Sequence, residues 1–290
     1  MNGPLTVAAP AKLNLFLHVG DKRGDGYHDL ESLVAFAACG DEIALESHDD
    51  LFLTVDGPFG VGVPTGEDNL ALKAAKLFAE RTGAAGGARI SLRKNLPVAS
   101  GLGGGSADAA AVLRGLTRLW QRELNRNELC RMAASLGADV AVCLDSVTAW
   151  MEGRGECVRA LPPLPRTGVL LVNPGVPVPT AQVFAALGVR RGLNLRAPKS
   201  GFEDVHTLVR YLRETTNDLE APAKTVAPLV GELLQVMNAL PDVLLARMSG
   251  SGATCFGLFA NEYVASAAAR LLRTRHPQWW IVESTFTDGS

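Results

Sequence analysis

Apolar residues recur at every second position near the start of the chain. Leu13, Leu15, Leu17 and Val19 alternate there with Asn14, Phe16 and His18. A period of two is typical of a strand that buries one face. The composition of residues 41–47 and 89–94 predicts two further strands.

A different spacing predicts three helices in the first half. Over residues 69–82, apolar side chains fall on one side of a helix. The same spacing follows Ser106, whose residue type commonly caps a helix N-terminus. A third helix is predicted from about Asn127 to Gly137, where glycine favours a stop.

The second half begins after a proline-rich stretch, residues 161–165, where three prolines break any regular element. Beyond it the pattern predicts, in chain order, a buried strand at 168–173, helices at 202–214 and 227–239, strands at 246–248 and 254–259, a helix at 262–273 and a strand at 280–283. Strands and helices in mixed order favour an α+β fold over a doubly wound parallel sheet. We expect two domains, residues 1–160 and 161–290.

Composition narrows the class of protein. The chain has 290 residues, of which 47% are hydrophobic and 20% charged, with a formal net charge of −2. It has no lysine or arginine block of the kind that follows a nucleic-acid backbone, so a small anionic substrate must meet a local cluster of donors. No stretch approaches the ~20 apolar residues of a membrane span, and no basic signal segment opens the chain. We expect a cytoplasmic protein that binds neither nucleic acid nor membrane.

The five cysteines, Cys39, Cys130, Cys143, Cys157 and Cys255, are scattered and form no CxxC pair. This pattern favours buried free thiols in a reducing compartment over a disulfide or zinc framework.

The most informative segment is residues 97–111, Pro97-Val-Ala-Ser-Gly-Leu-Gly-Gly-Gly-Ser-Ala-Asp-Ala-Ala-Ala111. Glycines that lie between a strand and a helix let backbone N–H groups approach an anion, with the helix dipole behind them. The segment is not a Walker A loop, because no Gly-Lys-Ser/Thr follows. Nor is it a dinucleotide fingerprint, because Ser106 stands where the third glycine belongs. It predicts a phosphate-binding loop.

This loop resembles the phosphate loop of the GHMP kinase superfamily, and two other segments resemble motifs of the same family. They are Pro10-Ala-Lys-Leu-Asn-Leu-Phe-Leu17 near the start and Met248-Ser-Gly-Ser-Gly-Ala-Thr-Cys-Phe256 near the end. The three motifs occur in the family's order over nearly the whole chain. The resemblance implies a two-domain α+β fold with ATP and an alcohol substrate in the cleft between the domains.

Four further motifs are similar to one branch of this family, the kinases of cytidine-diphosphate-linked methylerythritol. They are Pro10-Ala-Lys-Leu-Asn14 with Arg23-Gly-Asp-Gly-Tyr-His28, Leu136-Gly-Ala-Asp-Val140, Gly153-Arg-Gly-Glu156 and Asn173-Pro-Gly-Val-x-Val-Pro-Thr180. The resemblance implies transfer of the ATP γ-phosphate to the substrate's 2-hydroxyl, in the non-mevalonate route to isoprenoid precursors.

An alcohol has almost no alkoxide at neutral pH, so its phosphorylation benefits from a carboxylate that orients the hydroxyl and accepts its proton. The resemblance assigns this role to Asp139 and an electrostatic role to Lys12. From local sequence alone, Asp139 could cap a turn and Lys12 could be a strand-edge charge.

For the substrate, the resemblance implies contacts from Asn14, Tyr27 and His28, with an aromatic ring stacked on the pyrimidine. Thr180 and Phe184 match positions that line the same pocket. Two other interpretations remain open: Tyr27 and His28 could anchor a hydrophobic turn, and Phe184 could pack into the core.

For ATP, the resemblance implies contacts from the loop and its surroundings, namely Pro97, Gly101, Leu102, Gly103, Gly104, Gly105, Ser106, Ala107 and Asp108, together with Lys94 and Asn69. Ser106 can add a hydroxyl to phosphate or to the Mg²⁺ that such transfers use, and no residue is assigned as a metal ligand outright. Asn69 also suits a helix start. Asp108 either acts through Mg²⁺ or only caps the helix.

Two other functions remain possible on these residues: another GHMP small-molecule kinase, or a GHMP-fold sensor that binds ligands without transfer. Lys12 and Asp139 speak against a sensor, because a pure binder needs no base. The sequence does not decide between a monomer and a homodimer.

Overall fold

The computed structural model describes residues 3–84, 86–188, 193, 195–287 and 289. Its strands are β1 (Leu5–Lys22), β2 (His28–His48), β3 (Phe52–Asp56), β4 (Gly87–Arg93), β5 (Ala149–Gly153), β6 (Cys157–Ala160), β7 (Gly168–Asn173), β8 (Leu245–Met248), β9 (Cys255–Phe259) and β10 (Trp280–Thr287). Its helices are α1 (Leu70–Thr82), α2 (Gly104–Leu119), α3 (Arg126–Leu136), α4 (Ala138–Cys143), α5 (Thr180–Ala185), α6 (Val205–Arg213), α7 (Glu220–Val226), α8 (Leu229–Asn238) and α9 (Glu262–Arg275).

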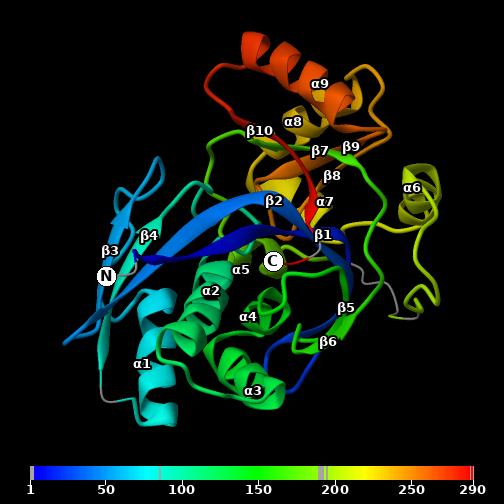
Figure 1. The fold of residues 1–290 in the computed structure, drawn as a ribbon. Helices are drawn as coiled ribbons and strands as arrows, with labels where there is room; N and C mark the ends of the chain where they lie inside the picture. Colours follow the sequence, from blue (N-terminus) through cyan, green and yellow to red (C-terminus); the bar gives the residue numbers. More distant parts are fainter. Residues whose placement is uncertain (1–2, 85, 189–192, 194, 288, 290) are drawn as a thin grey trace.

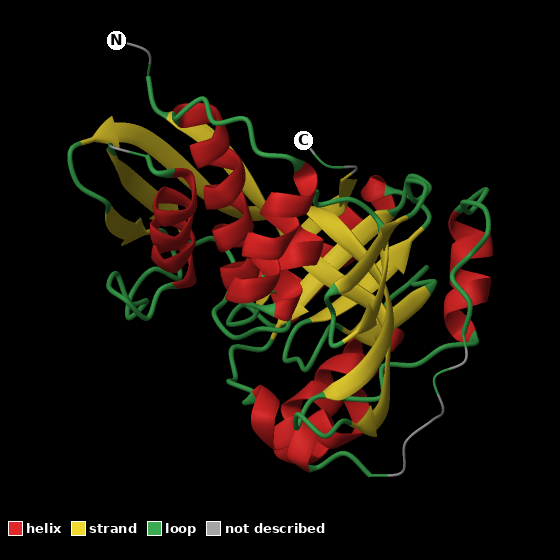
Figure 2. Cartoon of the chain, turned by 90° about the horizontal axis from the view of Figure 1, so that it is seen from below, coloured by secondary structure: helices red, strands yellow, loops and turns green. Residues whose placement is uncertain are grey.

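One sheet runs through both halves of the chain. Its order is β3-β4-β2-β10-β7-β9-β8, with β1 and β5 also paired to β2. Strand β10 pairs with β7 and with the middle of β2, and so joins the last residues to the first strands. Figure 1 shows α1 to α4 below the long β1 and β2 strands, with α8 and α9 at the opposite end. Figure 2 shows the same strands from below, with helices flanking them.

Local chemistry accounts for the helix ends in the first half. Asn69 caps α1, because its Oδ1 accepts a hydrogen bond from the backbone N–H of Ala71, and Gly83 ends the helix in the left-handed conformation. A capping box of Asn125 and Glu128 opens α3, which ends at Gly137 as expected.

Two expectations about these elements are wrong. Strand β1 buries both faces over most of its length, including Asn14, Phe16 and His18, because core side chains pack on each side. Helix α2 begins at Gly104 and its cap is Gly103, not Ser106, which lies in the first turn. The cap position has φ 63°, a left-handed conformation that glycine adopts without strain.

Most other elements lie where the pattern places them, and β7 covers residues 168–173 as predicted. The short elements α4, α5, α7, β3, β5 and β6 were not predicted. The mixed, mainly antiparallel sheet confirms the α+β class; the domain boundary near residue 160 stays a prediction.

All five cysteines are free thiols, but only Cys143 and Cys255 are fully buried, and Cys157 is exposed at the start of β6, which contradicts the expectation of uniform burial. No helix in the described part of the chain combines the length and apolar character needed to cross a bilayer.

Candidate active site

The residues singled out in the sequence gather around one cleft of about 1030 Å³. It is lined from both halves of the chain, by residues of β1, the 23–28 turn, the glycine loop, α4, α5 and the 250–251 turn. Of the predicted site residues, all line this cleft except Leu102 and Ala107, whose side chains are buried.

The glycine loop is held from two sides by backbone contacts. Gly101 has a φ of 79°, and its carbonyl accepts a hydrogen bond of 3.0 Å from the Ser249 hydroxyl. The backbone N–H of Thr254 donates to Ser100 O at 3.0 Å, and that of Lys12 donates to Leu102 O at 2.9 Å. The first and third motifs therefore fix the second, which leads directly into the positive end of α2.

Lys12 and Asp139, which both line the cleft, form an ion pair. Lys12 Nζ lies 2.9 Å from Asp139 Oδ2; the lysine side chain is 4% exposed and the aspartate 42%. Asp139 lies in the first turn of α4, the helix that directly follows α3. Lys12 is not a strand-edge charge but a buried cation, because it lies within the buried part of β1.

The stem of Lys12 also packs against the loop. A Cβ on Gly103 would lie 3.2 Å from Lys12 Cβ and Cε, so only glycine fits there without a shift. Lys12 thus contacts both the glycine loop and Asp139, which puts the loop, a cation and a carboxylate within one small volume.

Aromatic residues lie in the cleft on the 23–28 turn and on α5. Tyr27 is 58% exposed, so it does not anchor the turn in the core, and the Arg154 guanidinium lies 5.1 Å from its ring centroid. The His28 ring lies 5.6 Å from that of Phe184, which also packs on the second-half core. His28 Nδ1 is 3.1 Å from Gly20 O; because a carbonyl only accepts, Nδ1 carries the proton and, in the neutral ring, Nε2 can accept.

Two predicted polar residues, Asn14 and Thr180, form hydrogen bonds with neighbouring segments. The buried side chain of Asn14 donates to the Ser32 hydroxyl at 2.8 Å, and its backbone N–H donates to Ser249 Oγ at 3.2 Å. The Thr180 and Ser251 hydroxyls lie 2.8 Å apart, across from each other at the cleft wall.

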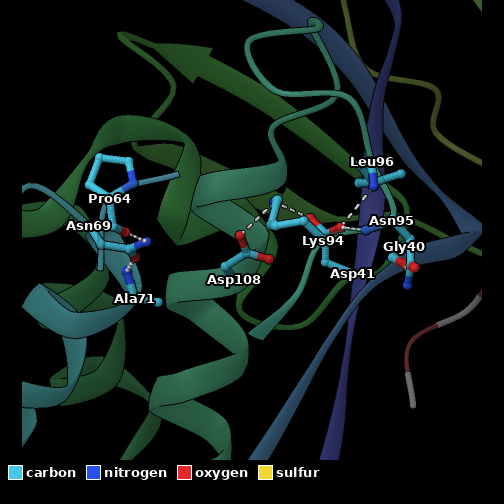
Figure 3. Close-up of polar contacts among 9 residues, drawn as sticks. All are labelled: Gly40, Asp41, Pro64, Asn69, Ala71, Lys94, Asn95, Leu96 and Asp108. Carbon is cyan, nitrogen blue, oxygen red and sulfur yellow. Dashed lines mark hydrogen bonds and ion pairs between the residues drawn. The ribbon is translucent and has the colours of Figure 1, made fainter. Parts of the chain in front are cut away.

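Figure 3 shows that three of the predicted nucleotide residues, Lys94, Asn69 and Asp108, contact other groups of the protein. Lys94 Nζ contacts carboxylates of Asp41 and Asp108, the second at 2.8 Å. Asn69 Nδ2 donates to Pro64 O at 2.7 Å while its Oδ1 caps α1, so its amide holds the 64–69 segment. Asn69 therefore caps the start of α1, as its residue type also suggested, and a contact with ATP stays a prediction.

Burial decides the ionisation of Asp108, which is 3% exposed. Burial raises the pKa of its carboxyl to about 7, although Lys94 opposes the shift. Burial alone would lower the pKa of Lys94, but the two neighbouring carboxyl groups, Asp108 and Asp41, together raise that pKa above its ordinary value. Asp108 neither faces solvent nor simply caps the helix: it faces Lys94.

Comparison with known proteins agrees with this arrangement. Residues 69–146 match the GHMP kinases N terminal domain, and residues 195–278 match the GHMP kinases C terminal domain. A 4-diphosphocytidyl-2-C-methyl-D-erythritol kinase of Parvibaculum lavamentivorans is 49% identical over 286 residues, covering 97% of this chain and 98% of its own. One of Paramagnetospirillum magneticum is 50% identical over 278 residues, covering 95% and 96%.

This chain belongs to the 4-diphosphocytidyl-2-C-methyl-D-erythritol kinases of the GHMP kinase family. A crystal structure of a 4-(cytidine 5'-diphospho)-2C-methyl-D-erythritol kinase matches it with a TM-score of 0.77 at 34% identity, covering 99% of this chain and all of that one. A homoserine kinase from Cytophaga hutchinsonii, only 18% identical, shares the fold at a TM-score of 0.75. As a GHMP kinase, the chain is an ATP-dependent small-molecule kinase.

Sequence reasoning missed several residues at the site of this kinase. Arg154 belongs to a motif that was noted without a role, and the structure places it over Tyr27. Ser251 lies in the third motif and also lines the cleft. Asp41 gave no signal: it is a single carboxylate at the start of a predicted strand segment, and only the fold brings it to Lys94.

Proposed function

We propose that this kinase transfers the γ-phosphate of ATP to the 2-hydroxyl of 4-diphosphocytidyl-2-C-methyl-D-erythritol, a step in the non-mevalonate route to isoprenoid precursors. The observation that carries the proposal is the position of Lys12, whose side chain lies against Gly103 of the glycine loop and also pairs with Asp139. The γ-phosphoryl group of ATP bound to the loop and a substrate hydroxyl beside Asp139 would therefore both lie next to the Lys12 ammonium group.

Asp139 is the proposed base. Its carboxylate orients the 2-hydroxyl and takes its proton, the hydroxyl oxygen bonds to the γ-phosphorus, and the bond from that phosphorus to ADP breaks. Lys12 holds the Asp139 carboxylate through their ion pair and offsets the charge of the phosphoryl group during transfer. The backbone N–H groups of residues 101–106 hold the ATP phosphates, with the α2 dipole behind them.

The aromatic residues of the cleft suit the cytidine end of the substrate. Arg154 covers one face of the Tyr27 ring, which leaves the opposite face for stacking on a pyrimidine. Nε2 of neutral His28 can accept a hydrogen bond from the exocyclic amine of cytosine. Phe184 lies beside that imidazole and extends the apolar surface.

The residues around Ser106 fit a Mg²⁺ ion held jointly with ATP. Asp108 Oδ1 is buried and has no hydrogen-bond partner, and Mg²⁺ prefers carboxylate and hydroxyl oxygens beside substrate phosphates. No group of three or more His, Cys, Asp or Glu in the described residues could hold a metal alone, which suits an ion that depends on the nucleotide. When bound, Mg²⁺ would neutralise phosphate charge; Ser106 and Asp108 are its proposed protein ligands.

The function is tested by a coupled ADP-release assay with ATP, Mg²⁺ and four alcohols in parallel. We expect turnover of 4-diphosphocytidyl-2-C-methyl-D-erythritol and none of mevalonate, homoserine or galactose. Preference for one of those three would favour another GHMP activity. Binding of ATP without turnover of any alcohol would favour a sensor and leave Lys12 and Asp139 without catalytic roles.

Replacing Tyr27 with alanine should raise KM for the cytidine substrate more than it lowers kcat. A stacked base contributes about 1–3 kcal/mol, which corresponds to a rise of about 5- to 100-fold in KM. Tyr263→Ala is the matched control, because Tyr263 is exposed on α9 and does not line the cleft. An unchanged KM in Tyr27→Ala would place Tyr27 outside the substrate site.

A further inference from the structure

Three charged side chains are buried directly behind the glycine loop. Asp41, Lys94 and Asp108 are 2%, 4% and 3% exposed, and Lys94 Nζ bridges the two carboxylates. Figure 3 shows Lys94 between its partners. The cluster touches the loop, because a Cβ on Gly104 would lie 3.3 Å from both Lys94 Nζ and Asp41 Oδ2.

Asp41 holds the segment that enters the loop. Its Oδ1 accepts hydrogen bonds from the backbone N–H groups of Asn95 at 2.6 Å and Leu96 at 2.9 Å, just after β4 ends. The Asn95 side chain adds a bond of 3.1 Å to Gly40 O. Strand β2 therefore fixes the backbone at the loop's first residues.

The same carboxylate reaches the other end of the loop through Lys94. Asp41 Oδ2 contacts Lys94 Nζ, and Lys94 Nζ holds Asp108 in the first two turns of α2. Both ends of residues 95–107 are thus tied to one residue of β2. Buried charges of this kind hold their geometry tightly, since a displaced partner would leave an uncompensated charge away from water.

Lys94 Nζ already contacts the carboxyl groups of Asp41 and Asp108, and the Asp41 carboxylate alone balances its charge before a nucleotide arrives. These two contacts argue that Lys94 shapes the loop and does not serve as a free cation for phosphate. Backbone N–H groups bind phosphate well only when their directions are fixed in advance.

We propose that Asp41 is a positioning residue for ATP: without touching the nucleotide, it holds both ends of the glycine loop in the phosphate-binding shape, through two backbone N–H groups and through Lys94. This role does not depend on which alcohol accepts the phosphate. It rests on the part of the proposed function that places the ATP phosphates at residues 101–106.

The test is Asp41→Asn, which keeps the size and one acceptor oxygen but removes the charge that holds Lys94. We expect Kd for ADP with Mg²⁺, measured by calorimetry, and KM for ATP to rise about tenfold or more, as when a residue that orients a binding group is lost. KM for the alcohol substrate should change less than about twofold. Amide hydrogen exchange should quicken in residues 95–107 and stay unchanged in the second-half core.

Glu283→Gln is the matched control, because it cuts a surface ion pair to Arg273 outside the cleft and should leave every constant unchanged. Asn95→Ala is the milder second variant: it removes only the bond to Gly40 O, keeps all three charges, and should raise KM for ATP about two- to threefold.

ADP binding by the wild-type chain and by the variants distinguishes failure of the positioning role from failure of the proposed ATP site. If the wild-type chain binds ADP and both Asp41→Asn and Asn95→Ala bind it equally well, the positioning role is overturned. An equal rise in the KM of both substrates would also overturn it, since general loss of structure would explain the result. A wild-type chain that binds no ADP would overturn the ATP site, and the inference with it.

Discussion

Asp139→Asn is expected to lower kcat by about 10²–10⁴-fold while Kd for ADP stays within about twofold of wild type. The amide keeps the shape of the carboxylate but cannot take the proton of the 2-hydroxyl. Because Asp139 pairs with Lys12 from the first turn of α4, its replacement should leave the glycine loop in place. The measurement is steady-state ADP release beside calorimetric ADP binding.

The control is Asp145→Asn, a surface aspartate that pairs with Arg126 outside the cleft and should keep wild-type turnover. Near-normal kcat in Asp139→Asn would remove Asp139 from the role of base. A loss of ADP binding as large as the loss of kcat would instead make Asp139 part of the nucleotide site.

Gly101→Ala should cause the second largest loss, at least about 30-fold in kcat/KM for ATP. A Cβ at this position would lie 2.3 Å from Ser249 O and 3.0 Å from Gly252 N. Both are backbone atoms, which cannot rotate away as a side chain can. The φ of 79° adds the strain of a left-handed alanine. These costs are about 1–2 kcal/mol for the backbone and about 1–3 kcal/mol for overpacking, and about 2 kcal/mol already corresponds to 30-fold.

The loop in this variant is expected to relax away from the 249–252 turn, into a shape that must be strained back before ATP binds. Gly231→Ala is the control, since its Cβ would meet only Lys224 side-chain atoms at ordinary contact distances. Steady-state kinetics at varied ATP checks both variants. Wild-type KM for ATP in Gly101→Ala would show that the tight packing of the two glycine turns is not needed for nucleotide binding.

The sequence predicts the parts of this site whose chemistry is local. The glycine loop could be singled out because its residue types and their order are those of a phosphate-binding loop, and the structure places its residues in the cleft. Asn69 shows the limit: its type suits both a helix cap and a binding residue, and only the bonds to Ala71 and Pro64 show that its amide is engaged.

Contacts between distant segments could not be predicted from residue patterns. Lys12 and Asp139 meet because β1 and α4 pack around the loop, and their roles were expected only from the family resemblance. The role of Asp41 was not predicted, because a single aspartate beside Gly40 forms no recognisable motif. The cap of α2 was misplaced at Ser106 because the loop continues into the helix through left-handed glycines, which a residue-type preference for capping does not anticipate.

The most direct test of the central claim is ³¹P and ¹³C NMR of the reaction of wild-type protein with ATP, Mg²⁺ and 4-diphosphocytidyl-2-C-methyl-D-erythritol. We expect ADP to form together with a new phosphomonoester whose phosphorus couples to the tertiary carbon C2, while the diphosphate of the cytidine arm stays intact. Inorganic phosphate as the only new phosphorus species, or a monoester on another carbon, would contradict transfer to the 2-hydroxyl.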